Sequence, residues 1–417
     1  MQSSRALKWR TGSLAALASA TLLLSACGSG GTAASSGTSA ASSAASSAAG
    51  SATSSGSASS GSSSAASSGS ATSGSAAATE AAVPTIVVPE GETVGVSLIT
   101  KTQNNPFFIA LNEAAEAEAA KVGVNLTLAS GSADGDEQAQ IDAVEQAIAR
   151  GDKGILITTN GPGVNPALEK AKAAGIIIIA LDTPLTPTDL ADMTFASNNF
   201  TAGTLIGEWA AAQLNGEKAT IAMLDLFNDK IVSLDHQRDQ GFLTGMGIDT
   251  KDDQVNGDED PTGTYSGGKG GEYEIVCNEP TTGSNDGGRS AMELCLTQDS
   301  GPNINTVYSL NEPAGAGGVA ALTSANITAP VVVSIDGGCG GIADVTAGVI
   351  GATALQYPSR MAAYGVDTVA ALARGGEAPA FSPGLDFFDT GLTLVTDSPV
   401  DGLPSITSAE AQDICWG

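Results

Sequence analysis

The feature that most constrains the fold is a repeated alternation of short apolar runs with longer segments of helical periodicity. The first series of apolar runs covers residues 93–99, 124–129, 154–157 and 176–181. Apolar strands that alternate with helices of 10–15 residues predict a doubly wound, mainly parallel sheet. A second series of the same kind begins with a predicted helix at 200–214 and ends with an apolar run at 331–335. We therefore expect an α/β protein with two lobes and a cleft between them, where ligand sites are common.

The segment Asn104-Asn-Pro-Phe-Phe108 follows the first apolar run. Pro106 suits the first turn of a helix, because its missing N–H would have no partner there. In α/β sheets of this kind, ligands bind at the carboxyl ends of the strands. The amide of Asn105 and the rings of Phe107 and Phe108 therefore form a candidate sugar site, with flat surfaces for stacking and polar groups for hydroxyls. The alternative is that both rings belong only to the core.

The N-terminus is typical of an exported lipoprotein. Basic residues precede an apolar run at 14–24, which leads into Leu24-Ser-Ala-Cys27. This pattern predicts a lipoprotein signal peptide at 1–27, with Cys27 lipidated and the chain anchored to the outer face of the cell membrane. Residues 28–79 are almost entirely Ser, Ala, Gly and Thr. Such a segment cannot bury an apolar core, so we expect residues 28–85 to be a disordered tether.

Charge and cysteine content exclude several classes. The formal net charge of −28 argues against a nucleic-acid partner, which requires a basic surface. Four cysteines follow Cys27, and an even number in an exported chain favours disulfides, of which three pairings are possible. We favour Cys277 with Cys295, which are close in sequence, and Cys339 with Cys415, which would fix the C-terminal tail. With one His and no Cys-x-x-Cys motif, no metal site is expected.

Motifs along residues 92–417 carry a family resemblance. They comprise Asn104 to Phe108, Ile179 to Asp182, Arg238 to Phe242, Asn311 to Pro313 and Ser334 to Gly337. In this order and spacing, the chain resembles the sugar-binding proteins of bacterial ABC importers, of the ribose-binding type (type I periplasmic binding proteins). The segments 354–358, 385–391 and 415–417 are closer to the fructose-binding branch.

The resemblance implies a hinge that closes two lobes over one ligand. The N-terminal lobe would comprise residues 92–196 and 357–397, and the C-terminal lobe residues 197–356 and 398–417. The implied function is capture of a monosaccharide for an ABC permease, with fructose first and ribose or mannose next. The chain would be a monomer, with no enzymatic activity and no cofactor. The alternatives are a sugar sensor that presents its closed form to a signalling receptor, a receptor for a non-sugar solute, and an exported hydrolase.

Two aspartates follow apolar runs in corresponding places of the two series, Asp182 and Asp336. A carboxylate accepts two hydroxyls at once through charge-assisted hydrogen bonds. The alternative is a helix cap or a turn residue. The third strand should supply a further polar group, and spacing favours Thr158 slightly over Thr159 and Asn160.

The resemblance adds three further positions. Arg238 matches an arginine that contacts the sugar, and its guanidinium can donate to two hydroxyls. Asn311 and Gln356 resemble amide positions that both donate and accept. Alone, Arg238 could form a surface ion pair and the amides could be turn residues. The family pattern also has an arginine directly after the first aspartate, where this chain has Thr183, which argues against ribose itself.

Overall fold

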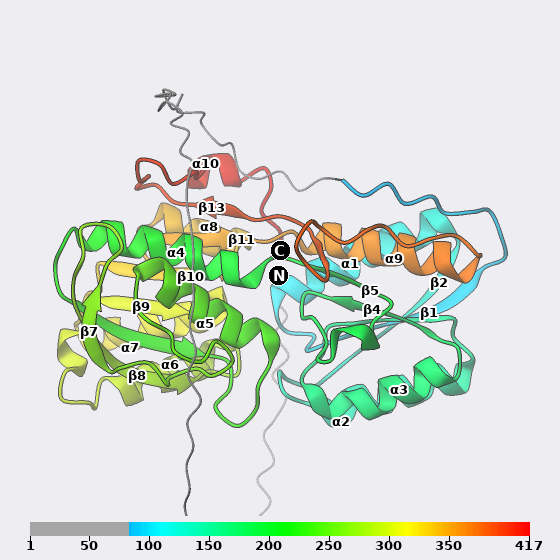
Figure 1. Cartoon of the computed structure of the whole chain (residues 1–417), viewed down its shortest axis with the longest axis horizontal. Helices are drawn as coiled ribbons and strands as arrows, with labels where there is room; N and C mark the ends of the chain where they lie inside the picture. The colour runs from blue at the N-terminus through cyan, green and yellow to red at the C-terminus, as the bar shows by residue number, and fades with distance from the viewer. Residues whose placement is uncertain (1–82) are drawn as a thin grey trace, which may run out of the picture. The chain divides into compact units, whose positions relative to one another are not determined.

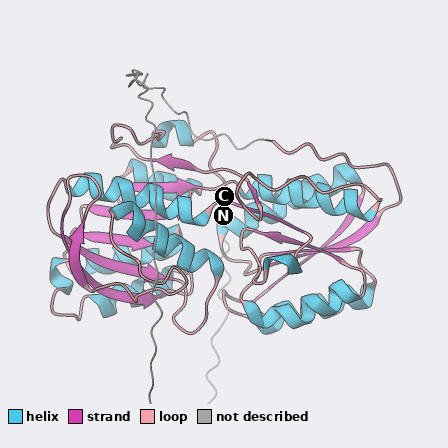
Figure 2. Ribbon diagram, in the orientation of Figure 1, coloured by secondary structure: helices cyan, strands magenta, loops and turns pink. Residues whose placement is uncertain are grey.

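The computed structural model describes residues 83–417. The predicted signal peptide, the lipidation site Cys27 and the predicted tether up to residue 82 lie outside the described residues. Within 83–417, no helix combines the length and apolarity that crossing a membrane requires. The expected fold class is confirmed, because the described chain forms two mainly parallel sheets, each enclosed by helices (Figure 2).

The first sheet has six strands in the order β12-β5-β4-β3-β1-β2, and every neighbouring pair is parallel. Its strands are β1 (Val94–Thr100), β2 (Val124–Ser130), β3 (Gly154–Ile157), β4 (Ile177–Leu181), β5 (Met193–Ala196) and β12 (Phe388–Asp389). Four helices accompany it: α1 (Pro106–Val122), α2 (Glu137–Arg150), α3 (Asn165–Ala173) and α9 (Pro358–Ala373). Helices α1 and α9 cover one face, and α2 and α3 cover the other (Figure 1).

The second sheet has seven strands in the order β13-β11-β10-β9-β6-β8-β7. Its strands are β6 (Ala219–Asp225), β7 (Thr262–Tyr265), β8 (Gly271–Pro280), β9 (Thr306–Ser309), β10 (Val331–Asp336), β11 (Ala352–Leu355) and β13 (Thr393–Val395). Only β7 and β13, at the two edges, are antiparallel to their neighbours. Its helices are α4 (Asn199–Leu214), α5 (Ser233–Met246), α6 (Asn285–Cys295), α7 (Glu312–Ser324), α8 (Cys339–Thr346) and α10 (Ser408–Ala411). Three-residue 3₁₀ helices occur at Pro162–Val164, Thr188–Leu190 and Gly301–Asn303.

Each sheet is buried on both faces, which explains why its central strands are continuously apolar. In β3, Leu156 packs with the α1 and α9 side, whereas Ile155 and Ile157 pack with the α2 and α3 side. In β6, Met223 packs with α4 and α5, and Leu224 packs with α6 and α7. Helices on both faces fix the strands, so the carboxyl ends of the strands are held at the edge where loops can carry functional side chains.

The chain passes between the two sheets three times. It leaves the first sheet after β5, returns after β11, and leaves again between β12 and β13. The third crossing is at residues 390–392, where Thr390 N–H donates to the carbonyl of Ala196. The sequence assigned 357–397 to the N-terminal lobe, but β13 pairs with β11 of the second sheet. The lobe boundary predicted at residue 397 is therefore too late in the chain. The strand β13, which follows the crossing, has only three residues and shows no periodic pattern that would mark it in the sequence.

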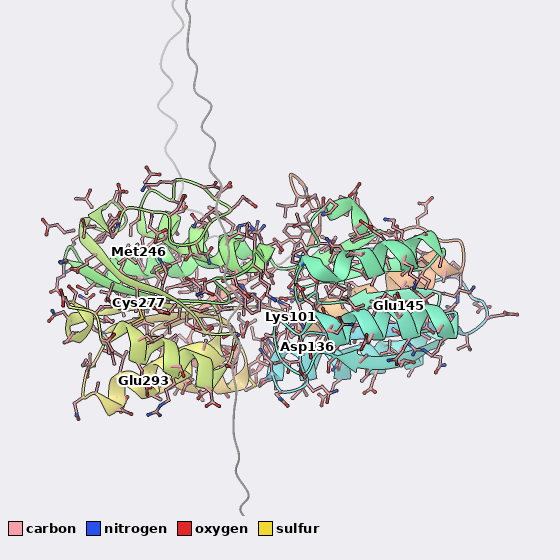
Figure 3. The ribbon with its side chains drawn as sticks, turned by 90° about the horizontal axis from the view of Figure 1, so that it is seen from below. Lys101, Asp136, Glu145, Met246, Cys277 and Glu293 are labelled. Atoms are coloured by element: carbon pink, nitrogen blue, oxygen red, sulfur yellow. A yellow bond between two sulfur atoms is a disulfide. The ribbon has the colours of Figure 1, made fainter. Side chains whose placement is uncertain are left out.

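The second lobe also contains an edge strand in the long connection after α5, and both disulfides lie in this lobe or reach it. The segment 248–272 contains the edge strand β7, which pairs with β8. Disulfides join Cys277 to Cys295 and Cys339 to Cys415, the pairing that the sequence favours. The first lies within the second lobe between β8 and α6 (Cys277 is labelled in Figure 3), and the second fixes the C-terminal tail to the start of α8.

Candidate functional site

A cavity lies where the carboxyl ends of the strands of both sheets meet. From the first lobe it is lined by Lys101, Asn105, Phe107, Phe108, Asp134 and Asp182. From the second lobe it is lined by Leu226, Leu234, Arg238, Leu310, Asn311 and Asp336. We call this the central cavity. Seven of the nine ligand-binding residues expected from the sequence line it, and the polar ones are supplied by both lobes.

Asp182 follows β4 directly, and Asp336 is the last residue of β10. Both side chains are buried. Both also have backbone angles that L residues adopt rarely, with φ of 62° at Asp182 and 149° at Asp336. Such strain costs about 1–3 kcal/mol and persists where the surrounding structure enforces it, often at functional sites. The two strands thus end in constrained turns that direct both carboxylates toward the central cavity.

Arg238, on α5, lies between these carboxylates. Its Nη2 is 3.8 Å from Asp182 Oδ1, and its Nη1 is 3.9 Å from Asp336 Oδ1. The guanidinium is only 3% exposed. It is oriented by two hydrogen bonds, from Nε to Asn199 Oδ1 (2.8 Å) and from Nη1 to the carbonyl of Leu310 (2.9 Å). The fork is therefore fixed by its own lobe, and it faces a carboxylate of the other lobe.

Lys101, which the sequence analysis did not select, also belongs to this cavity. It follows β1 and is labelled in Figure 3; it is 4% exposed, and its Nζ lies 3.7 Å from Asp182 Oδ2. Burial lowers the pKa of its ammonium group, and the Asp182 carboxylate partly opposes this shift. The signal available in the sequence was a lysine directly after an apolar strand. Because buried lysines are rare unless they are paired, a lysine at this position indicates a partner of opposite charge.

Asp134 is the second residue that sequence reasoning missed. It lies after β2 in a loop rich in small residues, where nothing in the pattern distinguishes it from a surface aspartate. Burial raises the pKa of its carboxyl to about 6, and Lys101 acts in the opposite direction. One of its oxygens, Oδ1, has no hydrogen-bond partner among the described residues. It is a free acceptor at the wall of the cavity.

The start of α1 supplies the aromatic wall. Asn105 caps the helix by accepting a hydrogen bond from the N–H of Phe107 (2.9 Å). Phe107 and Phe108 are buried, with ring centroids 5.4 Å apart in an edge-to-face arrangement. Both also pack in the core between α1 and the first sheet. The rings therefore combine the two roles that the sequence offered as alternatives, since they belong to the core and line the cavity.

Three expected ligand residues have other partners in the structure. Thr158 does not line the central cavity, and its hydroxyl accepts a hydrogen bond from Lys101 N–H (3.1 Å). Gln356 is also absent from the lining, and its amide donates to Asp336 Oδ1 (3.1 Å). Asn311 does line the cavity, but it caps α7 through Ala314 N–H and donates to the carbonyl of Gly283. These side chains support Lys101, Asp336 and the α7 start.

A buried glutamate holds the turn that follows Asp336. Glu312 accepts hydrogen bonds from the N–H groups of Gly337 and Gly338 (2.9 Å each) and from Thr353 Oγ1 (2.8 Å). Burial, and next the neighbouring Asp336, raise the pKa of Glu312 to about 8. Burial likewise raises the pKa of Asp336 to about 7, against the effect of Arg238. The second lobe therefore keeps two interacting carboxyls in a site with one buried arginine.

The distances across the cavity define its chemistry. Separations of 3.7–3.9 Å are too long for hydrogen bonds, so Lys101 and Arg238 retain donors and the two aspartates retain acceptors. A hydroxyl group placed among them can accept from a cation and donate to a carboxylate. No group of three or more His, Cys, Asp or Glu side chains within residues 83–417 is arranged to hold a metal ion. The arrangement suits a neutral, hydroxyl-rich solute.

Comparisons with known proteins agree with this geometry. Residues 96–377 match the model of the periplasmic binding protein domain. The ribose import binding protein of Escherichia coli is 26% identical over 289 residues, which cover 69% of this chain and 88% of that protein. The D-apiose import binding protein of Actinobacillus succinogenes is 31% identical over 244 residues, covering 58% of this chain and 69% of that protein.

Solved structures show the same fold. An ABC transporter solute binding protein from Mycobacterium smegmatis, with bound glycerol, has a TM-score of 0.60 at 26% identity and covers 72% of this chain and 93% of its own. A galactofuranose binding protein has a TM-score of 0.61 at 22% identity, and the match covers 77% of this chain and 97% of that protein. At 22% identity the second match is a likeness of fold.

Proposed function

The chain belongs to the periplasmic binding protein family, and we propose that it captures a monosaccharide between its lobes for an ABC importer. The observation that carries this proposal is the position of Arg238, which faces Asp182 of one lobe and Asp336 of the other at 3.8 and 3.9 Å. Hydroxyls of one sugar ring can bridge these groups and so connect the two lobes. Charge-assisted hydrogen bonds of this kind are the stronger ones available to a neutral solute.

Capture requires movement. The central cavity has a volume of about 30 Å³, which is space for roughly two water molecules. A sugar ring must therefore enter while the cavity is wider, and the three crossings between the sheets are the segments able to act as a hinge. In the closed complex, Phe107 and Phe108 would contact the ring, while Asp182, Arg238 and Asp336 would bind its hydroxyls. Lys101 and Asp134 extend this polar set.

Fructose is the favoured ligand, with ribose and mannose next. The preference rests on the motifs at 354–358, 385–391 and 415–417 and on Thr183, where the ribose type has an arginine. In the structure, Thr183 is buried and donates to Asp182 Oδ2 (2.8 Å). A short hydroxyl there leaves a different pattern of donors from a second guanidinium, which is consistent with a different arrangement of sugar hydroxyls.

The cellular setting follows from the N-terminus and the relatives. We propose that the chain is exported, cleaved before Cys27 and anchored by lipid on that residue, with 28–85 as a tether. It would act as a monomer and deliver the sugar to a membrane permease. The matched relatives are named as import binding proteins, and the exported hydrolase considered above gains no support from them. No cofactor is needed, because nothing is converted.

A thermal-shift screen tests this proposal. The protein without residues 1–27 would be heated with fructose, ribose, mannose, glucose, galactose and a set of amino acids. A solute that binds only the folded state raises the melting temperature by mass action. We expect a monosaccharide to do so, and we expect Asp336→Asn to abolish the shift while the unliganded variant still melts cooperatively. A response only to an amino acid would overturn the sugar assignment.

A further inference from the structure

The C-terminal residue pair Trp416-Gly417 contacts the segments that bound the central cavity. Trp416 Nε1 donates to the carbonyl of Gln356 (3.0 Å), and its own carbonyl accepts from Cys339 N–H (2.9 Å). Its backbone also pairs with Gly338. Its ring lies edge-to-face with Phe107 of the first lobe, with centroids 5.3 Å apart. One side chain therefore belongs to the second lobe by its hydrogen bonds and touches the aromatic wall of the first.

A covalent bond holds this tail in place. Cys415, next to Trp416, forms a disulfide with Cys339 at the start of α8, across 76 residues of sequence. Helix α10 supports the same connection. The Cys415 N–H donates to the carbonyl of Ala411 in α10, and Thr346 Oγ1 of α8 donates to Ser408 Oγ of α10 (2.9 Å). The indole is thereby fixed to the turn that follows Asp336. The disulfide, the bridge to Gly338 and the hydrogen bond to Gln356 together hold it beside that turn.

The indole of Trp416 lines a second cavity. Its volume is about 230 Å³, and Pro106, Pro313, Gly340 and Trp416 are among its lining residues. It shares Asn105 and Asp336 with the central cavity. Phe107 lines the central cavity but not this second cavity. Without the indole, Phe107 would lose its edge-to-face contact with Trp416.

We propose that Trp416 is a positioning residue for ligand binding, which holds Phe107 against the bound solute through a tail fixed by the Cys339–Cys415 disulfide. The inference rests on the proposed function, because it assigns the tail a part in the same site. An edge-to-face aromatic pair contributes enough for a change of about two- to twelvefold in affinity. Loss of the disulfide acts in the same direction, because the tail must then be ordered by the ligand.

The chain supplies matched controls. Cys277–Cys295 is a second disulfide of the same lobe, between β8 and α6, and neither cysteine lines the central cavity. Of the three tryptophans, Trp9 lies in the predicted signal peptide, which leaves Trp209 and Trp416. Trp209 is buried in the core of the second lobe. The variant Trp209→Phe therefore makes Trp416 the sole tryptophan of the protein without residues 1–27.

The experiment compares fructose affinity, by calorimetry, in Trp416→Ala, Trp416→Phe, Cys339→Ser/Cys415→Ser and Cys277→Ser/Cys295→Ser. We expect Trp416→Ala and the first cysteine pair to bind about two- to twelvefold more weakly through faster dissociation. Trp416→Phe should keep most of the affinity, and the second cysteine pair should lose stability but not affinity. Equal affinity in all four variants would overturn the inference. If Cys339→Ser/Cys415→Ser fails to fold, reduction of the Cys339–Cys415 disulfide in the native protein replaces it. If Trp416→Ala fails to fold, Trp416→Leu replaces it.

Emission of Trp416 in the Trp209→Phe protein separates this inference from the proposed function. If the native protein binds none of the sugars, the proposed function fails. The tail contact is then tested without ligand by acrylamide quenching, which should rise after Cys339→Ser/Cys415→Ser and after Phe107→Leu, but not after Cys277→Ser/Cys295→Ser. Quenching that is the same in all of these proteins would show that the tail does not pack on Phe107, and would overturn the inference as well.

Discussion

The guanidinium of Arg238, on α5 of the second lobe, lies 3.8 Å from the carboxylate of Asp182, at the end of β4 in the first lobe. The pair connects the two lobes at the cavity without a direct hydrogen bond. It therefore has capacity for a solute hydroxyl that would complete the connection. Closure of the lobes and recognition of the solute would then depend on the same two side chains.

Asp182→Asn should weaken sugar binding strongly. Asn tolerates the positive φ of 62° at this position, so the turn should be kept while the charge is lost. Losing one hydrogen bond to a charged group costs about 1.5–3 kcal/mol, which corresponds to roughly a 10- to 150-fold loss of affinity. Calorimetry measures this directly. Asp401→Asn, at an exposed carboxylate of the second lobe, is the control, and an equal loss in both variants would contradict a specific role for Asp182.

The stability of the unliganded protein should fall as the pH rises from about 4 to about 7. The pKa of Asp336 is raised to about 7 from its ordinary 3.8, so in this window the folded state holds a proton that the unfolded state has released. Stability then decreases with pH, by at most about 1.4 kcal/mol per pH unit for one proton. Glu312, with its pKa raised to about 8, acts in the same direction.

Urea denaturation at a series of pH values tests this expectation. Because the net charge of −28 also disfavours the compact state as carboxyls ionise, the informative quantity is the difference between native protein and Asp336→Asn. The variant should have the shallower slope between pH 4 and 7. Parallel pH profiles would mean that Asp336 carries no proton in the folded state.

The crossing at 390–392 should be sensitive to substitution of its glycine. Gly391 has a φ of 90°, donates to Asp389 Oδ1 (2.9 Å) and accepts from Ser197 Oγ. A side chain in left-handed backbone costs about 1–2 kcal/mol, so Gly391→Ala should lower the free energy of unfolding by this amount. Gly340→Ala is the control, because a Cβ there meets open space and its φ is ordinary. Equal stability of the two variants would contradict the constraint at Gly391.

Membrane attachment should depend on Cys27. In a host that processes lipoproteins, the native chain should appear in the membrane fraction, and Cys27→Ser should appear in the soluble exported fraction. The tether and both lobes are unchanged in this variant, so its sugar affinity should equal that of the native protein. Retention of Cys27→Ser in the membrane fraction would exclude a lipid anchor at this residue.

The sequence predicts the strand-ending residues of this site best. Parallel strands bring their carboxyl ends to one edge, so Asp182, Asp336 and the start of α1 could be expected to converge. Arg238 was found by resemblance, because a helix position alone gives no such signal. Lys101 was not selected because burial of a lysine depends on its partner, Asp182, which lies 81 residues away in sequence and is brought near only by the fold.

For a similar reason, the sequence did not predict that Thr158 and Gln356 would hold other residues of the site in place. Thr158 and Gln356 have the right residue type at the right strand ends, but their hydrogen bonds go to Lys101 and Asp336. Which neighbouring residue faces the cavity depends on the turn after each strand. The third crossing was placed too late because β13 has only three residues and pairs antiparallel with β11, and such a short strand leaves no periodic pattern.

Calorimetric titration of fructose, ribose, mannose and glucose into the native protein and into Arg238→Lys tests whether the arginine between the lobes binds the sugar. The lysine keeps the positive charge but cannot form the fork that faces Asp182 and Asp336. The proposed function predicts that at least one sugar binds with a stoichiometry of one, and that Arg238→Lys weakens this binding at least tenfold. Absence of heat with every sugar, together with binding of a non-sugar solute, would contradict it.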